Sequence, residues 1–414
     1  MTIRWITEQL GTSPWKEELA AAPFGVVDVR LLRDAAGNSP ALIQEKIAEA
    51  QNHLKGGRGV VICCDYGISR SNAIAAGVLA RVEGIGVDEA LERVIRATGE
   101  SGIKIDFVQD VRRALGMEQS STAAPKALIL GLDSFVGRAV NALLGIGQGD
   151  EAIEQNRALV WNPVLLDAAM QRSGSNRLLF CWHPPGMDTN LAVGQLVTGL
   201  RNALEVCRVR KAGLVFLSGQ QVFAGHKVAG QVSFGEADTP QPAGAAGDGL
   251  FLGEALIKQY AARYDMPTLI VRPPRVYGPG DERPWVLNTM VRKALAGEDI
   301  TTHRYRNGSP VIELLHVIDL ASALSLALEA GLTGVLHVSA ANSISTHELA
   351  ETVMRIAKSS SRLVSAEMPG DFRSVRLVSQ IANAVPEWAP TVRLEAGLAE
   401  LIASFAPDSL KEET

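Results

Sequence analysis

The sequence has 414 residues, of which 47% are hydrophobic and 21% are charged, and its formal net charge is −5. This length suffices for two or three domains, and the composition is that of a folded globular protein rather than a disordered chain. The negative net charge argues against non-specific nucleic-acid binding and against a polybasic membrane-binding surface.

Up to residue 117, the apolar pattern predicts a small α/β domain. Buried-type runs indicate strands at Gly25–Leu31 and Gly59–Cys63. Apolar residues three and four apart predict helices at Ala41–Leu54, Asn72–Glu83, Val87–Thr98 and Asp106–Leu115. A small, polar stretch at 118–126 with one proline then predicts a linker. We therefore expect a domain at 1–117, a linker at 118–126, a second domain at 127–406 and a frayed tail at 407–414.

In the second domain, strands and helices alternate, which indicates βαβ units and a parallel sheet. The expected strands are Ala127–Leu130, Arg157–Trp161, Arg177–Trp182, Gly213–Ser218, Pro267–Arg272 and Gly334–Ser339. The expected helices are Phe135–Leu144, Asn190–Arg208, Gly249–Tyr264, Trp285–Ala296 and Val317–Glu329. Ser345 and Glu348 predict a capping box that opens a further helix, Thr346–Ser359. The segment Gly225–Gly249 is rich in glycine, alanine and proline and predicts a loop.

A cysteine-containing loop joins the second strand of the first domain to the next helix. Its backbone N–H groups and those of the helix start would form a cradle for an anion, and Gly67 lets the loop turn tightly. Arg70 offers a planar set of donors that matches phosphate oxygens. The same positive surroundings favour the thiolate of Cys64, and Ser71 can donate to it. The residues expected to bind phosphate through this loop are Asp65, Tyr66, Gly67, Ile68 and Ser69.

The loop resembles the His-Cys-x-x-Gly-x-x-Arg-Ser motif of the dual-specificity (tyrosine-type) cysteine phosphatases. The resemblance implies Cys64 as nucleophile, Arg70 as phosphate binder and Ser71 as thiolate partner. It also implies an upstream aspartic acid as general acid, for which Asp34 is the candidate, although Asp34 can equally be a turn residue. The chain departs from the motif in two ways: Cys63 replaces the histidine, and Asp65 adds a carboxylate to the anion cradle unless it faces outward.

The second domain begins with a strand, a glycine turn and a helix start. This opening resembles the Gly-x-x-Gly-x-x-Gly pattern of the extended short-chain dehydrogenase/reductase family of nucleotide-sugar epimerases, dehydratases and reductases. The resemblance implies a Rossmann-like doubly wound parallel sheet, so the expected fold class is α/β in both domains. It places a dinucleotide at Gly131, Ser134, Phe135, Val136 and Gly137. Ser134 stands where the middle glycine normally lets the pyrophosphate approach the backbone.

Four later segments also resemble this family, but its catalytic residues are missing. The similar segments are Leu217–Gly225, Gly253–Glu254, Arg272–Asp281 and His316–Ala321. The family uses a tyrosine and a lysine four residues later, and the sequence contains no Tyr-x-x-x-Lys. Alignment on Gly253–Glu254 puts Ala246 and Leu250 at these positions and Gly219 at that of the catalytic serine or threonine.

Several polar residues fall at strand ends, where ligands bind in sheets of this kind. The candidates for a ligand cleft are His183, Ser218, Arg272 and Tyr277, with Arg275 beside them. The alternative for each is packing within the fold.

From these patterns we expect a phosphatase that hydrolyses a phosphomonoester through a phosphocysteine, fused to a catalytically degenerate nucleotide- or sugar-nucleotide-binding domain. One alternative is an NAD(P)-dependent nucleotide-sugar epimerase, dehydratase or reductase with altered catalytic residues, and another is a non-catalytic binding or scaffold protein. The phosphatase reaction needs no cofactor or metal, whereas NAD(P) or a nucleotide sugar stays open for the second domain. The expected partners are a phosphorylated small molecule or phosphoprotein and a second copy of the chain, without nucleic acid or membrane. Because the N-terminus lacks an apolar signal core and four cysteines form no disulfide pattern, we expect a cytoplasmic location.

Overall fold

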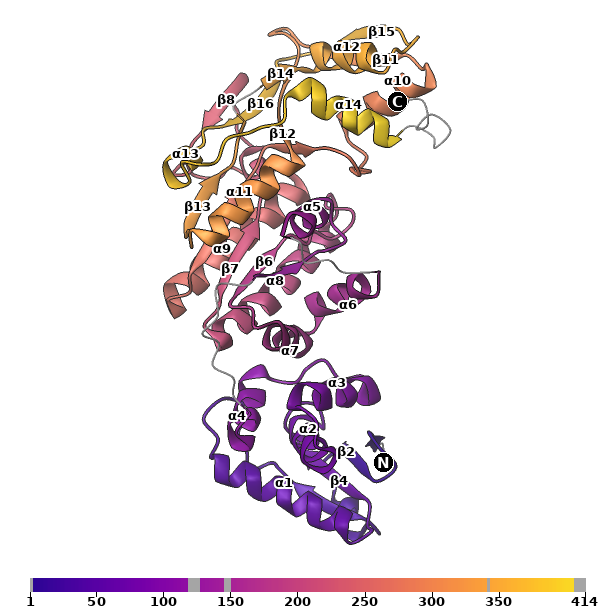
Figure 1. The fold of residues 1–414 in the computed structure, drawn as a ribbon, viewed down its shortest axis with the longest axis vertical. Coiled ribbons are helices and arrows are strands. Elements are labelled where there is room, and N and C mark those ends of the chain that lie inside the picture. Colours follow the sequence, from indigo (N-terminus) through magenta and orange to yellow (C-terminus); the bar gives the residue numbers. More distant parts are fainter. Residues whose placement is uncertain (1–2, 118–126, 145–149, 341–342, 406–414) are drawn as a thin grey trace. The chain divides into compact units, whose positions relative to one another are not determined.

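The computed structural model describes residues 3–117, 127–144, 150–340 and 343–405 (Figure 1). The described chain forms two compact units. The first unit comprises Met1–Leu128, Ala158–Asn176 and Asn202–Ala212, and the second comprises Ile129–Arg157, Arg177–Arg201 and Gly213–Thr414. The predicted linker, 118–126, and tail, 407–414, lie outside the described residues. Within the described ranges, no helix is long and apolar enough to cross a membrane.

The first unit is built on a four-stranded sheet with the order β1-β2-β4-β3. Its strands are β1 (Arg4–Trp5), β2 (Leu10–Pro14), β3 (Gly25–Asp28) and β4 (Val60–Cys64). β2 and β3 run parallel to the central β4, whose five residues are all buried, and β1 runs antiparallel to β2. The predicted strands β3 and β4 are confirmed. β1 and β2 were not predicted because they are short and Leu10–Pro14 has no apolar alternation.

Four helices of the first unit lie within two residues of their predicted bounds. They are α1 (Pro40–Lys55), α2 (Arg70–Glu83), α3 (Val87–Thr98) and α4 (Ile105–Leu115). α2 contacts the other three helices. Its own residues from Ser71 to Ala80 are all buried, and most of them have small side chains. The same unit includes α7 (Pro163–Ser173) and the end of α8 (Asn190–Arg210). There the buried Arg112 forms ion pairs with Asp88 and with the fully buried Asp167.

The second unit contains a five-stranded sheet with the order β13-β9-β7-β6-β5. The strands are β5 (Ala127–Leu130), β6 (Arg177–Phe180), β7 (Gly213–Leu217), β9 (Thr268–Arg272) and β13 (Gly334–His337). Adjacent strands from β6 to β13 are parallel, and Cys181 N–H donates to the carbonyl of Leu130 beside β5. A parallel Rossmann-like sheet is therefore confirmed. The double winding is not seen in the described residues, because the strands follow each other across the sheet in chain order.

Helices pack against this sheet in two groups. α5 (Phe135–Leu144) contacts α11 (Val317–Glu329). α8 contacts α9 (Gly244–Tyr264) through glycines of α9: a Cβ at Gly253 would lie 3.1 Å from Leu200 and 3.2 Å from Phe216 of β7. The predicted helices are confirmed within two residues, except that α9 begins five residues earlier and the helix predicted at Thr346–Ser359 ends at Ile356.

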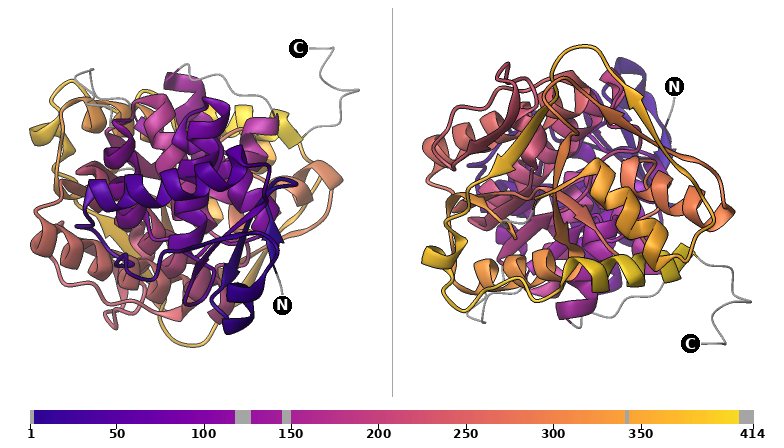
Figure 2. Two further views of the ribbon diagram at one scale, coloured as in Figure 1. Left: turned by 90° about the horizontal axis from the view of Figure 1, so that it is seen from below. Right: turned by 90° about the horizontal axis from the view of Figure 1, so that it is seen from above.

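The C-terminal part of the second unit, orange to yellow in Figure 2, adds a second apolar core around three helices. These are α10 (Val286–Ala296), α12 (Thr346–Ile356) and α14 (Leu394–Phe405). The capping box of Ser345 and Glu348 at the start of α12 is confirmed. Two small sheets flank this core: β10 (Arg275–Tyr277), β12 (Val311–His316) and β14 (Ser343–Ser345); and β11 (Ile300–Arg304) and β15 (Leu363–Glu367). A third small sheet consists of β8 (Gly230–Phe234) and β16 (Arg373–Leu377), and β16 contacts β12. The remaining short elements are η1 (Glu17–Ala21), η2 (Gln220–Phe223) and α13 (Ile381–Ala384).

Two predicted segments differ in the structure. The expected strand Arg157–Trp161 lies instead in helix α6 (Asp150–Trp161), where Asn156 and Val160, four residues apart, are both buried. The helical spacing of these buried residues therefore decides the structure of this segment, in spite of its residues with a preference for strands. The expected loop Gly225–Gly249 contains β8, which pairs with β16 from far along the sequence, and the first residues of α9. Local composition cannot reveal such a distant strand partner.

Candidate functional site

The cysteine loop of the first unit runs from the end of β4 into α2, as predicted. The N–H of Gly67 donates to Sγ of Cys64 at 3.2 Å, and this thiol lies 3.4 Å from Oγ of Ser71. Gly67 has a φ of +68°, and a Cβ there would lie 2.5 Å from the backbone nitrogen of Pro14. The turn therefore requires glycine whether or not it binds a ligand.

The two charged groups expected to serve phosphate chemistry, Arg70 and Asp34, already have partners within the protein. The guanidinium of Arg70 donates to the carbonyls of Arg30 and Leu32, both at 3.0 Å, and forms an ion pair with Asp65. Asp34 accepts a hydrogen bond from the hydroxyl of Ser69 at 2.5 Å. Asp65 thus compensates the positive charge that a phosphate dianion would need. The remaining loop residues differ in exposure, since Tyr66 is 75% exposed and Ile68 is half-buried.

The glycine turn of the second unit lies between β5 and α5. Gly131 has a φ of +92°, and a Cβ there would lie 2.6 Å from the backbone of Trp182 in the chain after β6. A Cβ at Gly137 would lie 1.9 Å from the carbonyl oxygen of Gly131. The hydroxyl of Ser134 accepts the N–H of Gly137 at 3.0 Å and so occupies the start of the helix.

A side chain from α6 fills the open side of this turn. The amide oxygen of Asn156 accepts the N–H groups of Gly131 and Leu132, at 2.9 and 3.1 Å, and its Nδ2 donates to the carbonyl of Ile129 at 2.7 Å. Asn156 is buried. Asn156 was not predicted as a site residue, because a lone asparagine just before a segment with a strand-like pattern carries no signal for such a role.

Arginines gather near the glycine turn. Arg138 of α5 donates to the carbonyl of Gly280 at 3.1 Å, and Arg283 lies 5.0 Å above the ring of Phe135. Arg283 also donates to the carbonyl of Val276 at 2.7 Å, next to Arg275. We call Arg138, Arg275 and Arg283 the arginine rim.

Arg275 differs from the other two arginines of the rim. Arg138 and Arg283 are held by hydrogen bonds, and Arg283 also pairs with Asp281. Arg275 is exposed and has no hydrogen-bond or ion-pair partner among the described residues. Although part of this residue is exposed, the surrounding protein desolvates its guanidinium, and this desolvation lowers its pKa together with the nearby charge of Arg283. Asp188, in the loop after β6, opposes this shift. An unpaired guanidinium beside a second one is an environment that an anionic ligand would stabilise.

The four residues predicted for a ligand cleft are largely committed to packing. Arg272 and Glu254 form a buried ion pair, and Ser218 donates to the same carboxylate at 2.6 Å. Tyr277 is buried with its ring edge-on to His316, and burial raises the pKa of its hydroxyl. Nε2 of His183 lies 3.0 Å from the carbonyl of Leu217, and burial lowers the pKa of this histidine to about 4. His183 is therefore neutral at pH 7.

The positions of the family's catalytic residues carry no acid or base. Leu250 is buried in α9, and Ala246 lies one turn earlier. A Cβ at Gly219 would lie 2.3 Å from Oε1 of Gln221. The sequence alone shows that these three positions carry glycine, alanine and leucine. The nearby Ser218 is engaged with the carboxylate of Glu254.

Comparisons with known proteins agree on the second unit. Residues 188–375 match the family described as RmlD substrate binding domain. The fold resembles a UDP-glucose 4-epimerase from Thermotoga maritima solved with UDP-glucose (TM-score 0.59, 20% identity, 67% of this chain and 98% of that one). It also resembles a dTDP-glucose 4,6-dehydratase from Bacillus anthracis solved with NAD (TM-score 0.58, 19% identity, 70% of this chain and 98% of that one). Residues 188–375 of the second unit are thus similar to the RmlD substrate binding domain.

A curated relative adds a narrower similarity. A dTDP-4-dehydro-6-deoxy-D-allose reductase from a Streptomyces species is 33% identical over 159 residues, which is 36% of this chain and 46% of the relative. The chain spans less than half the length of the curated relatives it matches. No known family matches the N-terminal region.

The prediction of a cysteine phosphatase is wrong. The similarities favour the nucleotide-sugar reductase, epimerase and dehydratase class, which was the first alternative. The physical reason lies in Asp65, which forms an ion pair with Arg70, the cation that was expected to bind a phosphate dianion beside Cys64. The cysteine loop is ordered by its own contacts.

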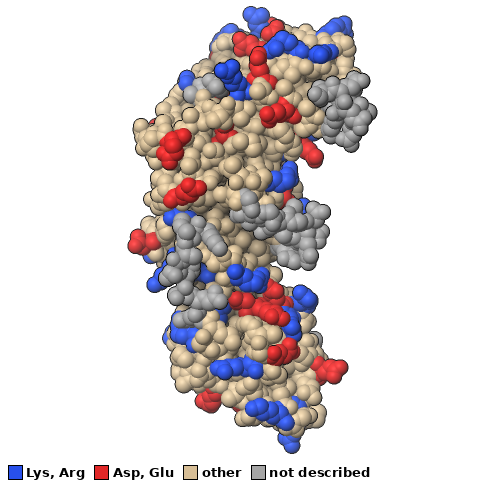
Figure 3. Space-filling view, in the orientation of Figure 1, with Lys and Arg blue, Asp and Glu red and all other residues tan. Residues whose placement is uncertain are grey.

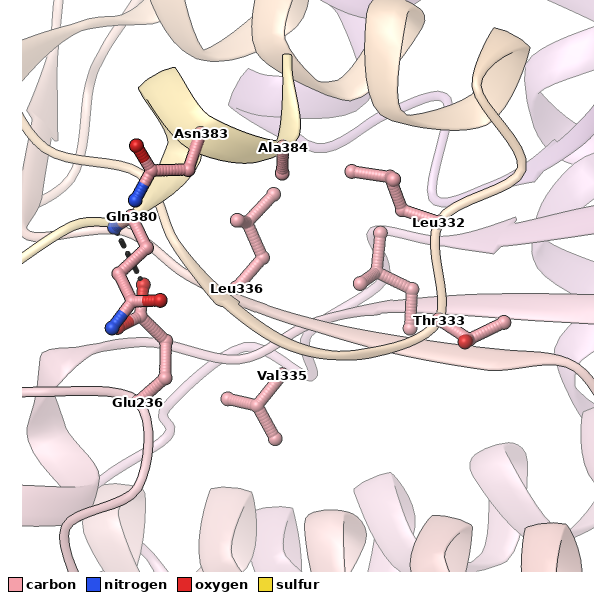
Figure 4. A pocket seen from close by; sticks show the side chains of 9 residues that line it. Glu236, Leu332, Thr333, Val335, Leu336, Gln380, Asn383 and Ala384 are labelled. Carbon is pink, nitrogen blue, oxygen red and sulfur yellow. Dashed lines mark hydrogen bonds between the residues drawn. The ribbon is translucent and has the colours of Figure 1, made fainter.

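The pocket in Figure 4 lies at the other edge of the second unit's sheet. It encloses about 280 Å³ beside β13 and is lined by apolar side chains such as Leu269 and Leu336, with Glu236 and Gln380 at its polar end. Oε1 of Glu236 accepts hydrogen bonds from the N–H groups of Gln380 and His337, at 2.9 and 3.2 Å, which protects the edge of β13.

On the face shown in Figure 3, acidic and basic groups are interspersed. No group of three metal-ligating side chains was found within the described ranges.

The buried thiols of Cys181, just after β6, and of Cys207, in α8, predict a pH dependence of stability. Burial raises the pKa of Cys181 and of Cys207 to about 12, whereas an unfolded thiol has a pKa of about 8.5. Above pH 8.5 the folded state therefore keeps protons that the unfolded state releases. The free energy of unfolding has its full value below pH 8.5 and falls at higher pH. We expect a loss of about 1.4 kcal/mol per pH unit and thiol above pH 9. Urea denaturation in a reductant at pH 8 and pH 10 measures it. Cys207→Ala should reduce the difference between the two pH values, and an unchanged difference would contradict the assignment.

Proposed function

We propose that the second unit binds a nucleotide sugar near the arginine rim. The observation that carries this proposal is Arg275, an unpaired guanidinium next to Arg283, within the segment that matches the RmlD substrate binding domain. Planar guanidinium groups bind phosphate oxygens through paired hydrogen bonds. The pyrophosphate of a nucleotide sugar would supply the missing negative charge.

The relatives support the same ligand class. The similar Thermotoga structure was solved with UDP-glucose, and the Streptomyces relative is named as acting on a dTDP-deoxy sugar. Titration calorimetry of the full chain with UDP-glucose and dTDP-glucose tests the proposal. Saturable binding in the micromolar to millimolar range usual for enzyme substrates is expected, with competition by the matching nucleoside diphosphate. Absence of heat with every nucleotide sugar would refute it.

Conversion of that nucleotide sugar, as a reductase, epimerase or dehydratase, is the second candidate function. It is favoured by the 33% identity to a dTDP-4-dehydro-6-deoxy-D-allose reductase. Incubation with a dTDP-4-keto-6-deoxy sugar and NADPH tests it, read out as loss of absorbance at about 340 nm and as a reduced sugar by mass spectrometry. The residues present do not fit this redox chemistry well, since Gly219, Ala246 and Leu250 replace the family's polar catalytic groups.

A further inference from the structure

The glycine turn can be tested as a site for a nicotinamide dinucleotide, the cofactor that the fold implies. In dinucleotide-binding sheets, strands lie on both sides of the first strand, and the ligand binds where the strand order reverses. In this sheet β5 lies at the edge, and the order β13-β9-β7-β6-β5 has no reversal in the described residues. From the end of β5 to the start of β6, the described chain is helical, in α5, α6 and α7. The described residues therefore lack the strands that would lie beyond β5 in the first nucleotide-binding half of such a fold.

Asn156 takes the place of the strand that would lie beside β5. In a strand, the carbonyl of one residue and the N–H of the residue two positions later point to the same side. The carbonyl of Ile129 and the N–H of Gly131 are such a pair, and both bind the side-chain amide of Asn156. The other side of β5 pairs with β6 through the carbonyl of Leu130. These two polar groups at the end of β5 are thus satisfied by Asn156, and a ligand that binds them would have to displace a buried side chain.

The start of α5 is also occupied. Ser134, at the position of the middle glycine, accepts the N–H of Gly137 and adds a side chain where a pyrophosphate needs close access to the backbone. The two remaining glycines are required by packing alone, because a Cβ at Gly131 or Gly137 would meet backbone atoms at 2.6 or 1.9 Å. Their presence therefore does not indicate a bound dinucleotide.

We infer that the glycine turn of this chain does not hold NAD(P), that Asn156 and Ser134 are its permanent occupants, and that the second unit binds its ligand without a nicotinamide cofactor. The nature of that ligand rests on the proposed function, whereas the closed turn does not. The chain would then share the sheet and the substrate-binding part of the reductases while lacking their hydride chemistry.

The test uses the full-length protein and NADH, NADPH and NAD⁺ as probes. After heat denaturation, chromatography of the supernatant should show no stoichiometric dinucleotide. Calorimetric titration should show no saturable binding up to about 1 mM, the upper end of usual cofactor and substrate affinities. The variant Ser134→Gly restores the family's glycine pattern and leaves Asn156 in place, and it should also fail to bind. Stoichiometric dinucleotide in the supernatant, or saturable binding to either protein, overturns the inference.

Parallel titration with UDP-glucose and dTDP-glucose keeps this result separate from the proposed function. Binding of a sugar nucleotide without dinucleotide binding supports both proposals. Binding of neither ligand supports the closed turn and refutes the nucleotide-sugar proposal. Dinucleotide binding refutes the closed turn whatever the sugar nucleotide does. Circular dichroism spectra and melting temperatures of both proteins verify that each is folded.

Discussion

Replacing Arg275 by alanine is expected to weaken nucleotide-sugar binding by about 10- to 100-fold. A hydrogen bond between charged groups contributes about 1.5–3 kcal/mol, and each 1.4 kcal/mol changes a dissociation constant by about tenfold. Arg275 has no partner to lose among the described residues, so its removal should not destabilise the fold. Calorimetric titration with UDP-glucose and dTDP-glucose measures the effect, and the melting temperature should stay that of the wild type.

Two further variants separate charge from geometry. Arg275→Lys keeps the positive charge but loses the planar pair of donors, so it should bind with intermediate affinity. Arg362→Ala is the matched control, because Arg362 is 82% exposed and pairs with Asp299 away from the arginine rim. It should bind like the wild type. If Arg275→Ala binds as well as Arg362→Ala does, the nucleotide site lies elsewhere.

The elements that sequence patterns predict well are those whose partners are local. β4 is a continuous run of buried residues, and α3 has its apolar residues at helical spacing, so both were predicted within one residue. The capping box of Ser345 and Glu348 is similarly local. By contrast, β8 pairs with β16, more than a hundred residues later, and neither strand has a strong pattern of its own. Such elements form because a partner exists, which single-sequence reasoning cannot see.

The candidate site shows the same limit. The pattern of Cys64, Gly67 and Arg70 correctly predicted a tight loop between a strand and a helix, and the structure places the N–H of Gly67 at 3.2 Å from the Cys64 thiol. It did not predict that Asp65 would turn back onto Arg70, although Asp65 was noted as a departure from the motif. The glycine turn around Gly131 was likewise predicted, while its occupant Asn156 lies just before a segment assigned to the wrong type of element. A polar side chain can form its hydrogen bonds either with a ligand or with a neighbouring residue. Which of the two occurs depends on tertiary contacts that a sequence motif does not specify.

Breaking the buried ion pair of Arg272 and Glu254 is expected to lower the free energy of unfolding of the second unit by about 3–5 kcal/mol. Both side chains are 1% exposed, with donor–acceptor distances of 2.8 Å to Oε1 and 2.5 Å to Oε2. Glu254→Gln leaves the guanidinium buried beside Nε2 of His337 without a compensating charge. For a unit of this size, the melting temperature should fall by roughly 10 °C, measured by differential scanning calorimetry.

The double variant Arg272→Met with Glu254→Leu distinguishes charge burial from loss of shape. Because it removes both charges together, it should recover at least half of the lost stability. Asp299→Asn, which breaks the exposed pair with Arg362, is the matched control and should change stability by at most about 1 kcal/mol. The same proteins decide whether Arg272 belongs to a ligand cleft, as the sequence suggested. If the ion pair only stabilises the sheet, the folded double variant should bind nucleotide sugars with wild-type affinity. A weakened affinity in that variant would show that Arg272 takes part in ligand binding.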